Sequence, residues 1–369
     1  MSSITAIGTA NPEHRFKQSQ LADFMVKAMQ LDRADSRKLR AIFNASGIDY
    51  RYSVLEDYGM ESGFTFYPNT PDFEPFPSTA KRMEFFRKNA LELSFRAVQN
   101  MMQSIDHFDL RQVTHLITVC CTGMYAPGLD IDLVKRLDLP TTVQRTGINF
   151  IGCYAAFNAL KVADAFCRAD PNAKVLIVCT ELCSLHFQKQ PTEDNLISNA
   201  LFADGAAAAL VEARYASAAP LRLTAETFYS DLTTEGEADM AWAIGDRGFE
   251  MKLSSYVPAI IKGGIGKFTL SLLERINRKL DDVRFFAIHP GGRKILESIE
   301  SELHLSKAQN AAAYHVLRNY GNMSSPTILF VLHEIMQKLK REDNGEYILS
   351  FAFGPGLTLE SMLLKVETD

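Results

Sequence analysis

The stretch that decides how this chain is interpreted is Gly147-Ile148-Asn149-Phe150-Ile151-Gly152-Cys153-Tyr154-Ala155-Ala156. The small and apolar residues after Cys153 favour a helix that begins beside the cysteine. The start of a helix carries partial positive charge and exposed amide donors, and both lower the pKa of a thiol. Taken alone, Cys153 is more often a buried structural cysteine, although Gly152 before it permits a sharp turn.

Two distant residues strengthen a catalytic interpretation. His289 ends the apolar run 285–288, and Asn322 follows Gly321. Each lies where a strand or glycine turn meets a helix-like stretch, the usual place for a side chain presented to a pocket. An imidazole can take the proton of a thiol, and an amide can donate to an anionic oxygen. The alternatives are a hydrogen-bonded core histidine and an asparagine that only caps a helix or forms a turn.

The composition excludes several classes of function. The chain has 369 residues, of which 47% are hydrophobic and 22% charged, and its net charge is -5. These values fit a globular protein large enough for two fused domains, and they give no sign of a nucleic-acid surface. No apolar run is long enough to span a bilayer, and residues 1–5 lack the start of a secretory signal. We therefore expect a cytoplasmic protein without membrane contact.

The cysteines predict neither disulfides nor a metal site. Several of the six lie in apolar stretches, where a free cysteine behaves as a small hydrophobe. Cys120-Cys121 and the Cys179/Cys183 pair lack Cys-x-x-Cys spacing, and no pair of histidines completes either set. We expect no metal.

The order of elements is mixed α/β. Short apolar or β-branched runs predict strands at 114–120, 175–179, 206–211, 284–288 and 347–353. Helical spacing predicts helices at 18–28, 82–102, 130–137, 154–168, 266–279, 292–303 and 326–341, the last capped by Ser324 or Ser325.

The chain divides into two predicted halves. Residues 1–218 carry Cys153, and residues 219–369 carry His289 and Asn322, with 216–220 as the connector. A site that draws on both halves would lie where they meet, which is a common position for a pocket.

Several motifs together resemble one family. The segment around Cys153 does not match the papain-like proteases, which also combine cysteine, histidine and asparagine. In the order in which the family has them, the chain instead contains segments that resemble the type III polyketide synthases, the chalcone and stilbene synthase-like enzymes of the thiolase superfamily. The segments are 120–128, 152–153, 200–208, 288–292, 321–325 and 353–358.

The resemblance implies a five-layered αβαβα fold made of two similar halves, usually as a homodimer. It implies that Cys153 accepts a starter acyl group from a CoA thioester and rests as a thiolate paired with the imidazolium of His289. His289 and Asn322 would bind the carbonyl of malonyl-CoA and stabilise the enolate left when carbon dioxide departs. CoA thioesters would be substrates, and no cofactor is expected.

The resemblance also implies a substrate pocket. Phe202 falls on an aromatic gatekeeper position, although it could serve only core packing, and Met251 falls on a second gatekeeper position that is phenylalanine in the plant enzymes. Trp242 replaces a small residue of the elongation cavity, which it would narrow if it points inward. Bacterial members, including those similar to tetrahydroxynaphthalene synthase, have such changes, which argue against a plant-like product. The remaining predicted pocket residues are Cys121, Cys183, His186 and Ser324.

The predicted contacts with CoA are Lys38 and Arg40 for the phosphates, and Gly291 and Gly292 for close approach of the pantetheine arm. The basic stretch 37–40 fits a solvated helix face equally well.

Two other functions are weighed against this one. A ketoacyl synthase III-like enzyme would share the Cys-His-Asn triad, but those enzymes follow the histidine with Gln-Ala-Asn, where this chain has Pro290-Gly291-Gly292. A catalytically silent relative that acts as a dimeric binding protein would not need the intact triad.

Overall fold

A single large sheet organises the molecule. The computed structural model describes residues 1–105, 108–213, 219–234, 236–237 and 239–368. Over these residues the sheet has nine strands in the order β11-β12-β13-β8-β1-β7-β6-β4-β5. The strands are β1 (Ser2–Ala10), β4 (His115–Cys120), β5 (Gln144–Asn149), β6 (Lys174–Leu182), β7 (Asp204–Ala213), β8 (Leu221–Leu232), β11 (Val283–Ile288), β12 (Tyr347–Gly354) and β13 (Thr358–Thr368).

The two parts of this sheet repeat one pairing pattern. In the first part β1, β7 and β6 pair antiparallel in turn, and β6 pairs parallel with β4. In the second part β8, β13 and β12 pair antiparallel, and β12 pairs parallel with β11. Among the described residues the two parts pair where Ser3 and Ile4 of β1 meet Thr224 and Leu223 of β8. The predicted fold of two similar halves is confirmed. The exact boundary at 218 stays a prediction, because residues 214–218 lie outside the described ones.

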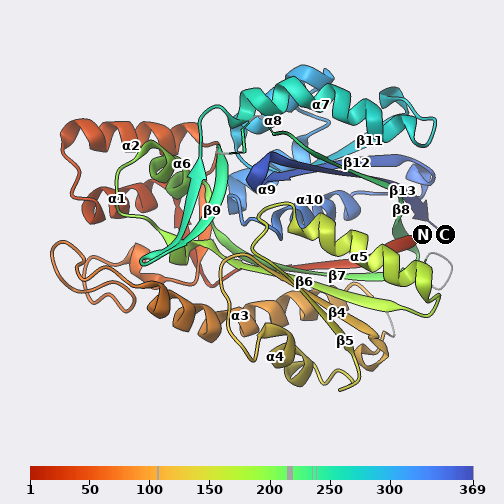
Figure 1. The fold of residues 1–369 in the computed structure, drawn as a ribbon, viewed down its shortest axis with the longest axis horizontal. Helices are drawn as coiled ribbons and strands as arrows, with labels where there is room; N and C mark the ends of the chain where they lie inside the picture. Colours follow the sequence, from red (N-terminus) through yellow and green to blue (C-terminus); the bar gives the residue numbers. More distant parts are fainter. Residues whose placement is uncertain (106–107, 214–218, 235, 238, 369) are drawn as a thin grey trace.

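Helices and sheets alternate in layers (Figure 1). Helices α3 (Thr79–Met102) and α4 (Leu129–Arg136) cover one outer face, and α7 (Val257–Glu274) and α8 (Arg293–Leu303) cover the other. Between the two sheet parts lie α5 (Ala155–Ala169) and α10 (Thr327–Met336). This is the αβαβα arrangement that was expected. Cys153 lies just before the start of α5, and Asn322 lies just before the start of α10.

A smaller group of elements closes one end of the layers, near α1 and α2 in Figure 1. It contains a hairpin of β9 and β10, a second short sheet of β2 and β3, and the helices that flank them. Their bounds are β2 (His14–Lys17), α1 (Gln18–Ala28), α2 (Arg33–Ala45), β3 (Tyr50–Ser53), the 3₁₀ turn η3 (Cys183–His186), α6 (Glu193–Leu201), β9 (Met240–Gly245), β10 (Gly248–Leu253) and α9 (Ala311–Tyr320). Short 3₁₀ turns occur as η1 (Glu56–Gly59), η2 (Leu110–Gln112), η4 (Leu280–Asp282), η5 (Arg341–Asp343) and η6 (Pro355–Leu357).

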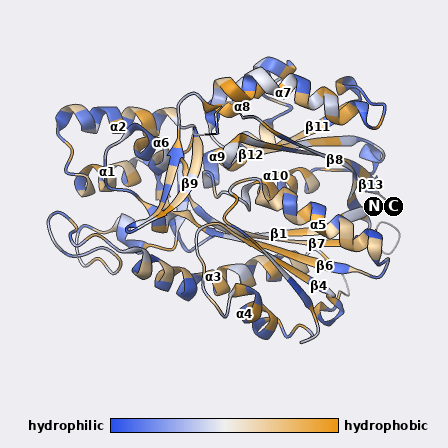
Figure 2. Ribbon diagram, in the orientation of Figure 1, coloured by the Kyte–Doolittle hydropathy of each residue, from blue (hydrophilic) through white to orange (hydrophobic). Residues whose placement is uncertain are grey.

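The central strands are apolar on both faces because helices cover both faces. Every residue of β4 and β7 is buried, and Figure 2 shows the sheet as the hydrophobic centre of the molecule. Strands that are buried on both faces read as continuous apolar runs. The five predicted strands have this pattern and are confirmed. The half-exposed β5 and β8 were not predicted, and the largely buried β1 and β13 were missed as well.

Two helix predictions were wrong at their ends. The helix predicted at 266–279 begins at Val257 and ends at Glu274. Gly263 and Gly264 do not break it, because Val257, Ile261 and Ile265 anchor one buried face across them.

The helix predicted at 326–341 spans only Thr327–Met336, and no serine side chain caps it. Ser325 instead donates to the Glu181 carboxylate at 2.6 Å. The Thr327 hydroxyl accepts from the backbone amide of Met323 at 2.9 Å, so it closes the turn before the helix.

Candidate active site

A tight turn presents Cys153 at the start of α5. After β5 the backbone passes through positive φ at Phe150 (62°) and Gly152 (87°), and α5 begins two residues after Cys153. A Cβ added to Gly152 would lie 2.4 Å from Cδ of Pro355. Glycine is therefore required by the backbone angle and by the neighbouring loop. The turn places the thiol against the positive end of the helix.

His289 follows the last residue of β11 and is held by its backbone. Its amide donates to the carbonyl of Phe351 at 2.8 Å, which extends the pairing with β12. The side chain is 1% exposed, and neither ring nitrogen has a hydrogen-bond partner among the described residues. A buried core histidine normally satisfies its ring nitrogens, so this side chain is better explained as one that awaits a ligand.

Asn322 bridges the two halves. Its backbone amide donates to Leu201 at 3.0 Å, and its carbonyl accepts from Ala203 at 2.9 Å, which makes an isolated bridge with Phe202. The side-chain oxygen accepts from the Ser324 amide at 2.8 Å and lies 4.0 Å from the Cys153 sulfur. Asn322 is thus a turn residue and also a neighbour of the thiol.

One cavity brings the three predicted catalytic residues together. Cys153, His289 and Asn322 all line it, and Gly291 lies in the same wall. The side-chain amide of Asn322 donates to the Gly291 carbonyl at 3.3 Å. An amide N–H and an imidazole that face one buried space can both donate to a carbonyl oxygen placed there.

Burial disfavours a charge on either partner alone. Burial raises the pKa of Cys153 to about 11, although hydrogen bonding with Ser324 and Asn322 partly offsets this rise. Burial lowers the pKa of His289 to about 3. Adjacent opposite charges stabilise each other strongly in such a medium. The thiolate and the imidazolium would therefore have to form together, and the ion pair implied by the resemblance stays a prediction.

A buried acid beside the site was not predicted. Glu181 lies in β6 and accepts from the Cys121 amide, from the Thr122 hydroxyl at 2.7 Å and from Ser325 at 2.6 Å. Burial raises its pKa to about 7, and its charge raises the pKa of Cys153. It does not line the Cys153 cavity. The signal was an acid at the end of an otherwise apolar strand, which is unusual unless the carboxylate has buried partners.

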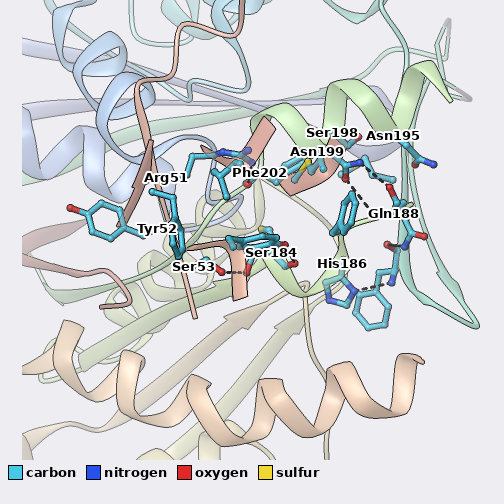
Figure 3. Close-up of a pocket in the computed structure, with 18 of the residues that line it drawn as sticks. Arg51, Tyr52, Ser53, Ser184, His186, Gln188, Asn195, Ser198, Asn199 and Phe202 are labelled. Carbon is cyan, nitrogen blue, oxygen red and sulfur yellow. Dashed lines mark hydrogen bonds between the residues drawn. The ribbon is translucent and has the colours of Figure 1, made fainter. Parts of the chain in front are cut away.

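A second pocket, here called the rear chamber, adjoins the first, and Figure 3 draws the residues that line it. Phe202 and Met251 line both spaces and so form the partition between them. Three other predicted pocket residues, Cys183, His186 and Trp242, line the rear chamber. Cys121 and Ser324 line neither space.

The bonds of these residues limit what each can do. The ring of His186 contacts the Thr122 carbonyl at 2.7 Å and the Phe249 amide at 2.9 Å, so both its nitrogens are occupied. Trp242 does point inward, and its indole N–H donates to the Cys121 carbonyl at 3.0 Å. The Cys121 sulfur accepts from the Gly152 amide at 3.1 Å, which supports the turn before Cys153. His186 is therefore a wall residue without acid–base capacity.

The predicted CoA residues are dispersed. Lys38 and Arg40 lie exposed on α2, where Arg40 forms an ion pair with Asp23. Gly291 lies in the wall of the Cys153 cavity, and Gly292 is the N-cap residue just before α8. The two glycines adjoin the reacting centre, and the two basic residues line neither pocket.

The described residues contain no group of three histidine, cysteine or acidic side chains placed to hold a metal ion. All six cysteines are described, and all are free. No helix over the described ranges is both long and apolar enough to cross a membrane.

Family models match nearly the whole chain. The model described as chalcone and stilbene synthases, N-terminal domain, matches residues 1–214, and the C-terminal domain model of the same family matches residues 225–367. Both matches favour this family over the ketoacyl synthase III-like alternative.

Individual relatives agree with the models. The "alpha-pyrone synthesis polyketide synthase-like Pks18" of Mycobacterium tuberculosis is 28% identical over 365 residues, which cover 98% of this chain and 91% of that protein. Probable polyketide synthase 1 of Dictyostelium discoideum is 28% identical over 369 residues, 98% of this chain but 11% of that protein.

Two solved structures are similar throughout. PKS-I from the brown alga Ectocarpus siliculosus superposes with a TM-score of 0.91 at 30% identity, over 99% of this chain and 98% of that one. The C-terminal type III polyketide synthase domain of Steely1 from Dictyostelium gives a TM-score of 0.89 at 28% identity, over 99% of both chains.

Proposed function

The chain belongs to the family of chalcone and stilbene synthases and is a type III polyketide synthase, and we propose that it condenses malonyl-CoA onto an acyl group held on Cys153. The observation that carries these residue roles is the shared cavity of Cys153, His289 and Asn322, in which the buried imidazole has no partner among the described residues. A site of this kind suits a reaction in which a carbonyl oxygen gains negative charge.

The first step loads the starter. Cys153 transfers its proton to His289 and attacks the thioester carbonyl of an acyl-CoA, and CoA leaves as a thiolate that takes up a proton. A thioester suits this exchange because the same kind of sulfur attacks and leaves. The result is an acyl group on Cys153 and a neutral imidazole at His289.

The second step extends the chain. The thioester carbonyl of malonyl-CoA accepts hydrogen bonds from His289 and from the side-chain amide of Asn322. Loss of carbon dioxide leaves an enolate whose oxygen the same two donors stabilise. The enolate carbon attacks the acyl carbonyl, the bond to the Cys153 sulfur breaks, and the lengthened chain remains on CoA.

The finer assignments follow the pocket geometry. Phe202 and Met251 would gate passage to the rear chamber, and Trp242, Cys183 and His186 would set its size. Cyclisation to a pyrone is supported by the relative named for alpha-pyrone synthesis, and a phenolic product is the alternative. Lys38, Arg40, Gly291 and Gly292 are the proposed contacts with CoA, and Cys121 and Ser324 the proposed supports around Cys153.

Assembly and location are part of the same proposal. We propose halves at 1–218 and 219–369, and a homodimer that uses β5, because this strand ends the described sheet and all six of its residues are exposed or half-exposed. An unpaired strand edge favours pairing with another copy. The free cysteines support a cytoplasmic location.

The test is incubation with malonyl-CoA and a panel of acyl-CoA starters, followed by mass spectrometry of the products. Cys153→Ala should still release carbon dioxide from malonyl-CoA but form no extended product. Asn322→Ala should lose the decarboxylation as well. Full product formation by Cys153→Ala would overturn the assignment.

A further inference from the structure

The rear chamber contains two buried polar atoms that have no partner among the described residues. They are Nη2 of Arg51 and the hydroxyl oxygen of Ser198. Arg51 is 4% exposed and Ser198 is 8% exposed, and both side chains line the chamber (Figure 3). A buried donor left without an acceptor costs free energy that a ligand can recover.

Arg51 is fixed in place by its other contacts. Its Nε donates to Gln18 at 2.8 Å, and its Nη1 donates to the Phe202 carbonyl at 2.6 Å. Its stem lies under Gly321, where an added Cβ would come within 2.9 Å of Cγ of Arg51. The guanidinium cannot turn toward solvent without breaking these contacts, so Arg51 stays in the chamber wall with Nη2 unpaired among the described residues.

Ser198 differs from the other small polar residues of the same wall. The hydroxyls of Ser53 and Ser184 bond to each other at 2.7 Å, and the Asn199 amide is occupied by the backbone of Gln188. Ser198 lies in α6 one turn before Phe202, whose amide uses only the backbone carbonyl of Ser198. Its hydroxyl is free to donate to a molecule in the chamber.

The charges around Arg51 favour an uncharged hydrogen-bond acceptor as the ligand. Asp204 attracts the Arg51 cation, and because the pKa of Asp204 is raised only to about 6, its carboxylate is ionised at pH 7. An anionic ligand would bring an additional charge that has no cation of its own. The rest of the wall includes Leu21, Met25 and Phe249, which favour a hydrocarbon chain.

We infer that Arg51 and Ser198 form an oxygen-binding subsite in the rear chamber that accepts a ketone oxygen on an otherwise apolar acyl chain. The inference rests on the proposed function, since a growing polyketide carries a carbonyl on every second carbon. A chain attached at Cys153 enters the chamber past Phe202 and Met251. The subsite then holds the chain at a fixed depth.

Binding can be measured without turnover in the Cys153→Ala background. Trp242 is the only tryptophan of the chain and lines the chamber, so its fluorescence reports occupancy. Saturated acyl-CoAs are compared with 3-oxo-, 5-oxo- and 7-oxoacyl-CoAs of equal length. At least one oxo isomer should bind more tightly than the saturated chain. Ser198→Ala should reduce that preference by about 3- to 10-fold, the effect of one lost hydrogen bond, and Arg51→Lys should reduce it too.

The matched control is Ser53→Ala, in the same wall, whose hydroxyl is already bonded to Ser184. It should leave the oxo-to-saturated ratio unchanged. Because Ser198→Ala removes no internal bond, it should fold as the parent does. The inference is overturned if no oxo isomer is preferred, or if Ser198→Ala keeps the full preference. Failure of wild-type protein to form products would refute the proposed condensation but would leave this binding result intact.

Discussion

The pH dependence of Cys153 alkylation tests whether His289 activates the thiol. Burial raises the pKa of Cys153 to about 11. At pH 7 a thiol with that pKa is ionised to about one part in 10⁴, whereas an ordinary cysteine is ionised to a few per cent. Only a thiolate–imidazolium pair formed as a unit would give Cys153 substantial reactivity near neutral pH.

We expect alkylation of wild-type Cys153 by iodoacetamide to vary little between pH 6 and 9. In His289→Gln the rate at pH 7 should fall by about 10³-fold or more, and it should rise about tenfold per pH unit toward pH 11. The rate falls in the variant because, without the imidazole, nothing offsets the burial that raises the pKa of the thiol. Peptide mapping by mass spectrometry isolates the signal, because burial raises the pKa of the other five cysteines as well.

His186→Gln is the matched control, since His186 is also buried but both its ring nitrogens are occupied by backbone groups. It should leave the Cys153 profile flat, and circular dichroism checks that each variant is folded. The reasoning is refuted if wild-type protein shows the same tenfold rise per pH unit as His289→Gln.

Two further predictions concern residues around the site. Trp242→Ala removes the hydrogen bond to the Cys121 carbonyl and enlarges the rear chamber, so the products should contain more malonyl units, as measured by mass spectrometry. Trp242→Phe should keep the wild-type product lengths. Identical products from all three proteins would contradict a role of Trp242 in chamber size. Burial raises the pKa of Glu181 from 4.5 to about 7. The contribution of the neutral carboxyl to the free energy of unfolding is therefore complete below pH 4.5 and is lost as the pH rises through 7. Relative to Glu181→Gln, wild-type protein should therefore lose about 3 kcal/mol of unfolding free energy between pH 4.5 and 8 in urea titrations, and a constant difference would exclude an ionisable Glu181.

The sequence predicted the parts of the fold whose pattern is local. The helix at 18–28 and the strand that begins at Tyr347 start where their patterns start, because both are bounded by clear changes in polarity. The predicted start of α7 at 266 falls after two adjacent glycines, Gly263 and Gly264, which lower the helix propensity of this stretch. Its buried face, which includes Ile261 and Ile265, outweighs that propensity, and such burial is known only once the sheet is assembled.

The residues that share the Cys153 cavity could be selected from sequence where residue type and flanking motif coincide, as for Cys153 and His289, and their catalytic roles stay predictions. Arg51, Ser198 and Glu181 carry no such motif. What distinguishes them is burial together with the presence or absence of a partner, and some of the contacts join segments more than a hundred residues apart, as in the bonds from Arg51 to Phe202 and from Ser325 to Glu181. Sequence periodicity does not report contacts of that range, so these three residues emerge only from the structure.

The bridge between Phe202 and Asn322 couples the two halves at the reacting centre. Phe202 belongs to the half that carries Cys153, and the backbone of Asn322 is held by Leu201 and Ala203 on either side of it. The position of Phe202 relative to Asn322, the proposed oxyanion donor, is therefore fixed. Arg51 adds a hydrogen bond to the Phe202 carbonyl that supports this arrangement. A shift of one half against the other would move the donor and the partition together. The proposed gating of the chamber and the proposed stabilisation of the enolate would therefore both depend on this one backbone bridge.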